Sequence, residues 1–193
     1  MRRCAASSAS GWNIEALVRS NPSVAAQPDI RVTVDRLLAA EKTLAGTASF
    51  QPLQGEQRQQ RWRKACVIQG EVTPLDIEVQ AYPDSPNLKF RIILIYQRAI
   101  WRLDYSEDGT HFNSTNRPND LGAGPICGPH YHTWEDNRRF STKSALPHTL
   151  RNARNVPSNL RTFENAFRWF CGETRILVLT AEIPCLPTRV SLL

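Results

Sequence analysis

Six polar residues between positions 102 and 132 carry the candidate chemistry of this sequence: Arg102, Asp104, His111, Asn113, His130 and His132. Two imidazoles that titrate near neutrality can act as a general acid and a general base. An arginine beside them can stabilise the negative charge that develops on a phosphoryl group. One hypothesis is therefore a ribonuclease that cleaves a phosphodiester without a metal ion.

In such an enzyme each side chain would have a distinct role. His130 and His132 would be the acid and the base, one taking the 2′-hydroxyl proton and the other protonating the leaving oxygen. Arg102 would stabilise the pentacoordinate phosphorus, and Asp104 would orient a neighbouring side chain. His111 is an alternate partner for the proton transfers, because a turn could bring it and the nearby asparagine over the other residues.

The same residue types allow other interpretations. His111, His130 and His132 together with Asp104 form a workable ligand set for zinc or iron. Alternatively, His–Asp and Arg–Asp hydrogen bonds could simply tie two strands and a loop together. Cys127, which precedes His130 by three residues, is conceivable as a nucleophile.

A second candidate site follows the histidine pair and is basic and aromatic; its members are Trp134, Arg138, Arg139, Arg151, Arg154 and Arg161. Spaced arginines suit phosphate contacts, and an aromatic ring can stack a nucleobase. The chain has 24 basic and 18 acidic residues, a net charge of +6, and 20 of its basic residues are arginine. Nucleic acid or an acidic protein is the expected partner. The alternative is an ordinary solvated face.

The sequence lacks the motifs by which several enzyme classes are usually identified. There is no Walker A, G-x-G-x-x-G, H-E-x-x-H or G-x-S-x-G motif, which speaks against a kinase, a dinucleotide-dependent oxidoreductase, a zincin and an α/β-hydrolase. No apolar run approaches the ~18 residues that span a bilayer. The five cysteines form no C-x-x-C pair, so we expect reduced thiols and a cytoplasmic protein.

The helices and strands that must position the site are predicted to form an α+β fold. We expect an antiparallel sheet of about five strands with two or three helices packed on it. Helical spacing predicts one helix over residues 29–44, capped by Asp29, and another that begins near Ser158 and stops at Gly172. Strand-like segments are residues 61–69, 75–81, 88–96, 99–105, 130–134 and 174–183. Because alternate residues of a strand share a face, Arg102 and Asp104 would face the same way as His130 and His132 if their strands pair.

The expected organisation is one domain with two appendages. Residues 1–28 read as an N-terminal tail or extension, with a short helix around 13–19. Residues 29–183 form the single α+β domain, and residues 184–193 a C-terminal tail.

The series R-L-D at 102–104, H-x-N at 111–113 and H-x-H at 130–132, followed by a helix ending F-x-W-F-C at 167–171, resembles an uncharacterised bacterial and phage domain family. Its layout is similar to TumE-like toxin components of toxin–antitoxin systems. The resemblance covers about residues 60–175 and departs after His132, where Glu135–Arg139 replaces a Gly-rich turn. It implies a protein of a mobile-element or toxin–antitoxin context that interacts with nucleic acid. The alternative is a phage-borne inhibitor that docks a host defence or nucleoprotein complex through its arginines, with the histidines structural or metal-binding.

Overall fold

The computed structural model describes residues 28–54 and 56–188. The expectations for residues 1–27, including the short helix at 13–19, and for residues 189–193 lie outside the described part of the chain.

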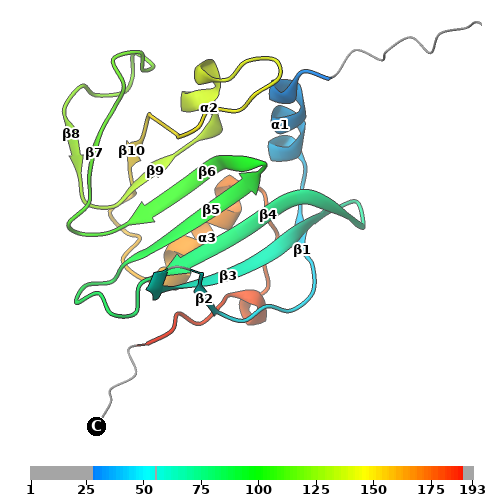
Figure 1. Ribbon diagram of the computed structural model, residues 1–193, viewed down its shortest axis with the longest axis vertical. Helices are drawn as coiled ribbons and strands as arrows, with labels where there is room; N and C mark the ends of the chain where they lie inside the picture. The colour runs from blue at the N-terminus through cyan, green and yellow to red at the C-terminus, as the bar shows by residue number, and fades with distance from the viewer. Residues whose placement is uncertain (1–27, 55, 189–193) are drawn as a thin grey trace, which may run out of the picture.

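An antiparallel sheet of eight strands is the centre of the molecule (Figure 1). The strand order is β1-β3-β4-β5-β6-β9-β10, and β2 pairs with β3 beside this path. The bounds are β1 Thr43–Leu44, β2 Gln51–Leu53, β3 Glu56–Ile68, β4 Glu71–Ala81, β5 Phe90–Tyr96, β6 Arg98–Tyr105, β9 His130–His132 and β10 Arg154–Asn155. A separate hairpin pairs β7 (Thr110–Phe112) with β8 (Pro125–Cys127). The predicted fold class, an antiparallel sheet with helices on it, is confirmed, and short added strands account for the larger strand number.

Local sequence explains how the central strands connect. Gln69 and Gly70 have φ angles of 53° and 84°, the left-handed pair that a two-residue hairpin turn requires between β3 and β4. In β4 the apolar residues Leu75, Ile77 and Val79 are buried without exposure, and polar residues alternate with them. This period of two gives the sheet one apolar face and one polar face.

The apolar face is covered by helix α3 (Phe163–Glu173), which lies behind the sheet in Figure 1. Phe167 and Phe170 on this helix are fully buried. The Trp62 ring meets Phe167 edge-on at a centroid distance of 6.0 Å, and Trp101 meets Phe170 at 4.9 Å. Two further helices, α1 (Ile30–Ala39) and α2 (Trp134–Asn137), lie at one end of the sheet. No helix in the described ranges is both long and apolar enough to cross a bilayer.

The first predicted helix ends earlier than expected. Asp29 caps it as predicted, accepting from the Arg31 backbone N–H at 3.0 Å, but the helix ends at Ala39. The buried Lys42 ammonium closes this end by donating to the carbonyl oxygens of Leu37, Leu38 and Ala40. The segment to Leu44, expected to be helical, then pairs with β3 as strand β1.

Two predictions in the C-terminal third are wrong. The second helix begins at Phe163, because the Thr162 hydroxyl rather than Ser158 caps it, and Gly172 lies inside it. Residues 174–183 form no strand: Ile176 makes one isolated bridge to Lys42, and a 3₁₀ turn follows at 180–182. Leu177 and Leu179 are 53% and 72% exposed, so the apolar run that suggested a buried strand is mostly at the surface.

Candidate functional site

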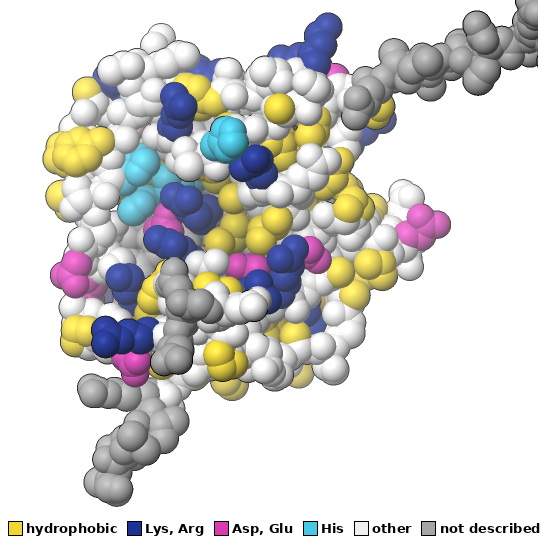
Figure 2. Space-filling model, in the orientation of Figure 1, with side chains coloured by type: hydrophobic (Ala, Val, Ile, Leu, Met, Phe, Trp, Pro, Cys, Tyr) yellow, Lys and Arg dark blue, Asp and Glu magenta, His cyan; other side chains and the backbone are white. Residues whose placement is uncertain are grey.

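Strands β6 and β9 pair as the sequence suggested and bring four of the six polar residues together. Arg102 lies opposite His132 and Asp104 lies opposite His130 in the antiparallel register. Their side chains alternate with Leu103, which is fully buried on the apolar face. The four therefore lie on the polar face of the sheet, where Figure 2 shows histidine, basic and acidic side chains side by side.

Asp104 is the anionic centre of this group. Its Oδ2 accepts from Arg102 Nε at 2.6 Å, and its Oδ1 lies 2.8 Å from Arg91 Nε on the neighbouring strand β5. Burial alone would raise the pKa of the Asp104 carboxyl, but the contact with His132 and the charges of both guanidinium groups outweigh burial and lower it. Asp104 is therefore ionised at neutral pH and compensates one of the two positive charges of Arg91 and Arg102.

His132 is fully buried and has partners at both ring nitrogens. Nδ1 lies 3.0 Å from the Asn152 carbonyl oxygen, to which it donates. Nε2 then carries the lone pair and accepts from Arg102 Nη2 at 2.8 Å. Arg102 thus bridges two acceptors, since Asp104 Oδ2 lies only 3.2 Å from His132 Nε2. Burial lowers the pKa of His132 to about 4, so this imidazole is neutral at pH 7.

His130 and His111 are less enclosed. His130 Nδ1 donates to the Gly128 carbonyl at 2.9 Å, and its Nε2 lies 3.6 Å from Asp104 Oδ2. His111 comes from strand β7, and its Nε2 donates to the Arg151 carbonyl at 3.0 Å, leaving Nδ1 as the acceptor. The two rings stack with centroids 5.3 Å apart. Burial lowers the pKa of His111, and the neighbouring His130 acts in the same direction.

Three asparagines hold the histidines in place: the predicted site residue Asn113, and Asn137 and Asn152, which were not among the predicted site residues. Asn113 accepts from the Ala153 N–H at 2.7 Å and donates to the Ala153 carbonyl at 3.2 Å, so it anchors the β7–β8 hairpin. Asn137 makes the same paired contact with the backbone of Asn152, at 2.8 and 2.9 Å. Asn137 and Asn152 are fully buried. Their only sequence signal was their position in turn-rich segments, where asparagine is common for many reasons.

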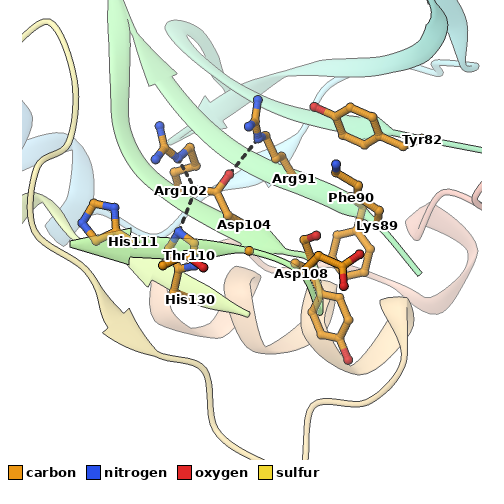
Figure 3. Close-up of a pocket in the computed structure, with 13 residues that line it drawn as sticks. Tyr82, Lys89, Phe90, Arg91, Arg102, Asp104, Asp108, Thr110, His111 and His130 are labelled. Carbon is orange, nitrogen blue, oxygen red and sulfur yellow. Dashed lines mark hydrogen bonds and ion pairs between the residues drawn. The ribbon is translucent and has the colours of Figure 1, made fainter. Parts of the chain in front are cut away.

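A pocket of about 330 Å³ opens beside this cluster, between the β4–β5 turn and the loop after β6 (Figure 3). The lining residues that matter for its chemistry are Tyr82, Lys89, Arg91, Arg102, His111 and His130. His132 and Cys127 do not line it. The whole lining of the pocket combines three cationic side chains, two carboxylates, two histidines and three aromatic rings. The sequence shows Arg91 at a polar position of the 88–96 segment, but its place opposite Asp104 depends on the register between β5 and β6.

The residues of the second candidate site differ in burial and in partners. Trp134 is 4% exposed and donates from its indole N–H to Asp35 Oδ1 at 2.7 Å. It is a core residue, so the expectation that it stacks a nucleobase is wrong. Arg138 pairs with the same Asp35 carboxylate at 2.8 Å.

The other arginines of that set have separate surroundings. Arg154 forms ion pairs with Asp136 at 2.7 Å and with Asp120 at 2.8 Å. Arg139 donates to the Asn116 side chain at 3.3 Å. Arg151 lies 5.2 Å from the Phe140 ring centre, and Arg161 is exposed shortly before α3. Asn116 and Asp120 both lie in the loop between β7 and β8, so Arg139 and Arg154 contact the same segment, whereas Arg138 is engaged by Asp35 of α1.

The three histidines could also hold a metal ion. One ring nitrogen from each of His111, His130 and His132 lies within 4.8 Å of the others. Each ring donates its other N–H to a backbone carbonyl, an arrangement common among metal-binding histidines. Arg102, however, occupies the acceptor faces of His132 and Asp104, two of the four expected ligands. A guanidinium in that position opposes a cation through like-charge repulsion.

Comparison of the chain with protein-family models, with curated proteins and with solved structures finds no match. The chemistry of the site must therefore carry the functional conclusion.

Proposed function

We propose that the protein binds RNA in the pocket and cleaves its phosphodiester without a metal ion. The observation that carries this proposal is the lining of one pocket by His111, His130, Arg91 and Arg102. Two histidines supply a base and an acid, and two guanidinium groups supply the charge that a phosphorane requires. A mobile-element or toxin–antitoxin context and a cytoplasmic location remain part of the proposal.

The reaction is a transfer of the phosphoryl group to the adjacent 2′-oxygen. The Nδ1 lone pair of His111 takes the 2′-hydroxyl proton while the 2′-oxygen attacks phosphorus. The bond from phosphorus to the 5′-oxygen breaks, and the Nε2–H of protonated His130 gives its proton to that oxygen. The products are a 2′,3′-cyclic phosphate and a 5′-hydroxyl. Asp104 faces the His130 Nε2 at 3.6 Å, which suits it to balance the charged imidazole.

This assignment differs from the first hypothesis in its use of His132. Full burial and two engaged ring nitrogens favour a positioning role for His132, which orients Arg102, rather than a proton transfer to substrate. His111, the alternate partner in the sequence hypothesis, takes that place because it lines the pocket. Asn113 likewise becomes an anchor of the hairpin that carries His111.

The test measures cleavage of a fluorescent single-stranded RNA in the presence of a chelator. We expect His111→Ala and His130→Ala each to lower the rate by about 10²–10⁴-fold, the usual contribution of a general acid or base. His148→Ala is the matched control, since this exposed histidine lies outside the cluster. Circular dichroism verifies that each variant is folded. Absence of cleavage by the wild-type protein, or equal rates in all three variants, would overturn the proposal.

A binding protein without catalysis is the second candidate. It is favoured by one observation, that all three clustered histidines donate to backbone carbonyls and so contribute to the architecture. In that case the basic pocket would dock an acidic or nucleic-acid-containing partner, as a phage-borne inhibitor of a host complex would. Tight RNA binding by the wild-type protein without cleavage would favour it.

A further inference from the structure

The pocket extends beyond the histidines to a wall that the proposed reaction does not use. Tyr82 and Lys89 lie at the turn between β4 and β5, on the far side of Arg91 from the histidines (Figure 3). The backbone N–H of Tyr82 donates to the Lys89 carbonyl at 3.3 Å, which keeps the two residues together. Asp108, from the loop that leads to β7, and Thr110, the first residue of β7, also line the pocket (Figure 3).

The character of this wall is aromatic and cationic. The Lys89 ammonium lies 5.1 Å from the Tyr82 ring centre, and the Arg91 guanidinium carbon lies 6.0 Å from it. A tyrosine flanked by cations is suited to a nucleobase stacked on the ring with its phosphates beside it, as in proteins that bind single strands. The pocket volume lies near the lower end of the ~300–1,000 Å³ usual for ligand sites, enough for one nucleotide-sized group.

We propose that Tyr82, Lys89 and Arg91 form a subsite for the nucleotide next to the scissile phosphate, so that the substrate is single-stranded RNA. This inference rests on the proposed function. A base must leave its helical stack to lie on the Tyr82 ring, and unstacking has a free-energy cost that a single strand largely avoids. The subsite tolerates any base, since every base has a π face.

The experiment measures binding rather than cleavage. The probe is a 2′-O-methyl RNA dinucleotide, which lacks the attacking hydroxyl, and its abasic counterpart with the same phosphate. Tyr82→Phe keeps the ring, whereas Tyr82→Leu keeps apolar bulk and removes it. Tyr96→Leu is the matched control, a partly buried tyrosine at the opposite end of β5.

We expect Tyr82→Leu to weaken dinucleotide binding roughly 5- to 150-fold, the range that corresponds to one stacked base. Tyr82→Phe and Tyr96→Leu should stay near the wild-type affinity, and the abasic probe should bind all four proteins alike. Equal loss with both probes, or no loss in Tyr82→Leu, would overturn the inference. If binding depends on the Tyr82 ring but natural RNA is not cleaved, the proposed reaction is wrong and the subsite is supported. If natural RNA is cleaved but binding does not depend on the ring, the subsite is wrong and the proposed reaction is supported.

Discussion

At the scale of single residues, Arg102 determines what the histidine cluster can do. Its guanidinium donates to Asp104 Oδ2 at 2.6 Å and to His132 Nε2 at 2.8 Å, which keeps two acceptors of a metal-like ligand set occupied. It also lines the pocket, where its charge is available to a phosphate. One side chain therefore favours anion chemistry over cation binding.

This role predicts that Arg102→Ala creates a zinc site. Removal of the guanidinium leaves His132 Nε2 and Asp104 Oδ2 open toward the other two imidazoles, completing four ligands. Titration against a chelating dye should show stoichiometric zinc on Arg102→Ala and none on the wild type. Arg91→Ala is the control, because its partner is the other oxygen of Asp104. Stoichiometric zinc in purified wild-type protein would contradict this account.

The burial of His132 predicts an acid-sensitive fold. Its pKa is lowered from 6.5 to about 4, so between these values only the unfolded chain binds the proton, and the free energy of unfolding falls as pH falls. The loss reaches about 3 kcal/mol, since one pKa unit corresponds to about 1.4 kcal/mol. The pKa of Asp104 is also lowered, but its contribution is lost only below its ordinary value of 3.8. Above pH 6.5 His132 is neutral in both the folded and the unfolded chain, so it no longer makes the free energy of unfolding depend on pH.

Urea unfolding at several pH values from 7.5 to 4.5 measures this effect. The His132→Asn protein, which keeps a donor for the Asn152 carbonyl, should lose the part of the pH dependence between 6.5 and 4 that His132 contributes, whereas the part from the lowered pKa of His111 should remain. The exposed His148→Asn variant serves as the reference and should follow the wild type. Parallel curves for His132→Asn and the wild type would show that His132 titrates normally.

At the scale of elements, period-two alternation was the most informative sequence signal. It placed Arg102, Asp104, His130 and His132 on one face, because strand geometry leaves no other choice once β6 and β9 pair. Helix ends were less predictable, since the apolar Leu44 fits a helical spacing and equally fits the buried position it occupies in β1. His111 lies beside the other histidines because its strand is hydrogen-bonded to the backbone of residues 151–153. These residues are distant in the sequence, so no local pattern predicts the contact.

One substitution should therefore be enough to loosen the β7–β8 hairpin from the backbone that anchors it. Asn113→Ala removes both hydrogen bonds to Ala153 and leaves a backbone N–H without its partner, at a cost of about 1–3 kcal/mol. We expect a modest fall in the free energy of unfolding, faster hydrogen exchange at residues 110–113 and a large loss of RNA cleavage. Asn159→Ala, at an exposed turn, is the control. Unchanged exchange in the hairpin would show that Asn113 is not its anchor.

At the scale of the whole molecule, the net charge of +6 overstates the basic surface. Among the residues that the structure describes, seven arginines form ion pairs with carboxylates: Arg31, Arg63, Arg91, Arg102, Arg138, Arg154 and Arg168. Composition could predict an anionic partner but could not locate it, because ion pairing depends on which strands and loops are neighbours. In the pocket, Arg91 and Arg102 share the one carboxylate of Asp104, so together with Lys89 they keep an excess of positive charge over Asp104 and Asp108.

The small size of this basic set predicts a shallow salt dependence for the proposed binding of RNA. Three phosphate contacts on a single strand give a slope of about −2 for log affinity against log salt concentration. Fluorescence anisotropy with a labelled RNA measures the slope, and Lys89→Ala should reduce it by about 0.7. A slope steeper than about −5 would indicate that a much larger basic surface contacts the RNA.

The position of α3 in the chain has a consequence for biosynthesis. The sheet can be complete once β10 has been made, yet α3, the helix that covers its apolar face, comes later in the chain, at residues 163–173. At ~5–20 residues per second, residues 156–173 take about 1–4 s to synthesise. During that interval the nascent chain lacks the helix that covers the apolar face of its sheet. Slow codons just after β10 would therefore lengthen the period in which the newborn protein depends on chaperones.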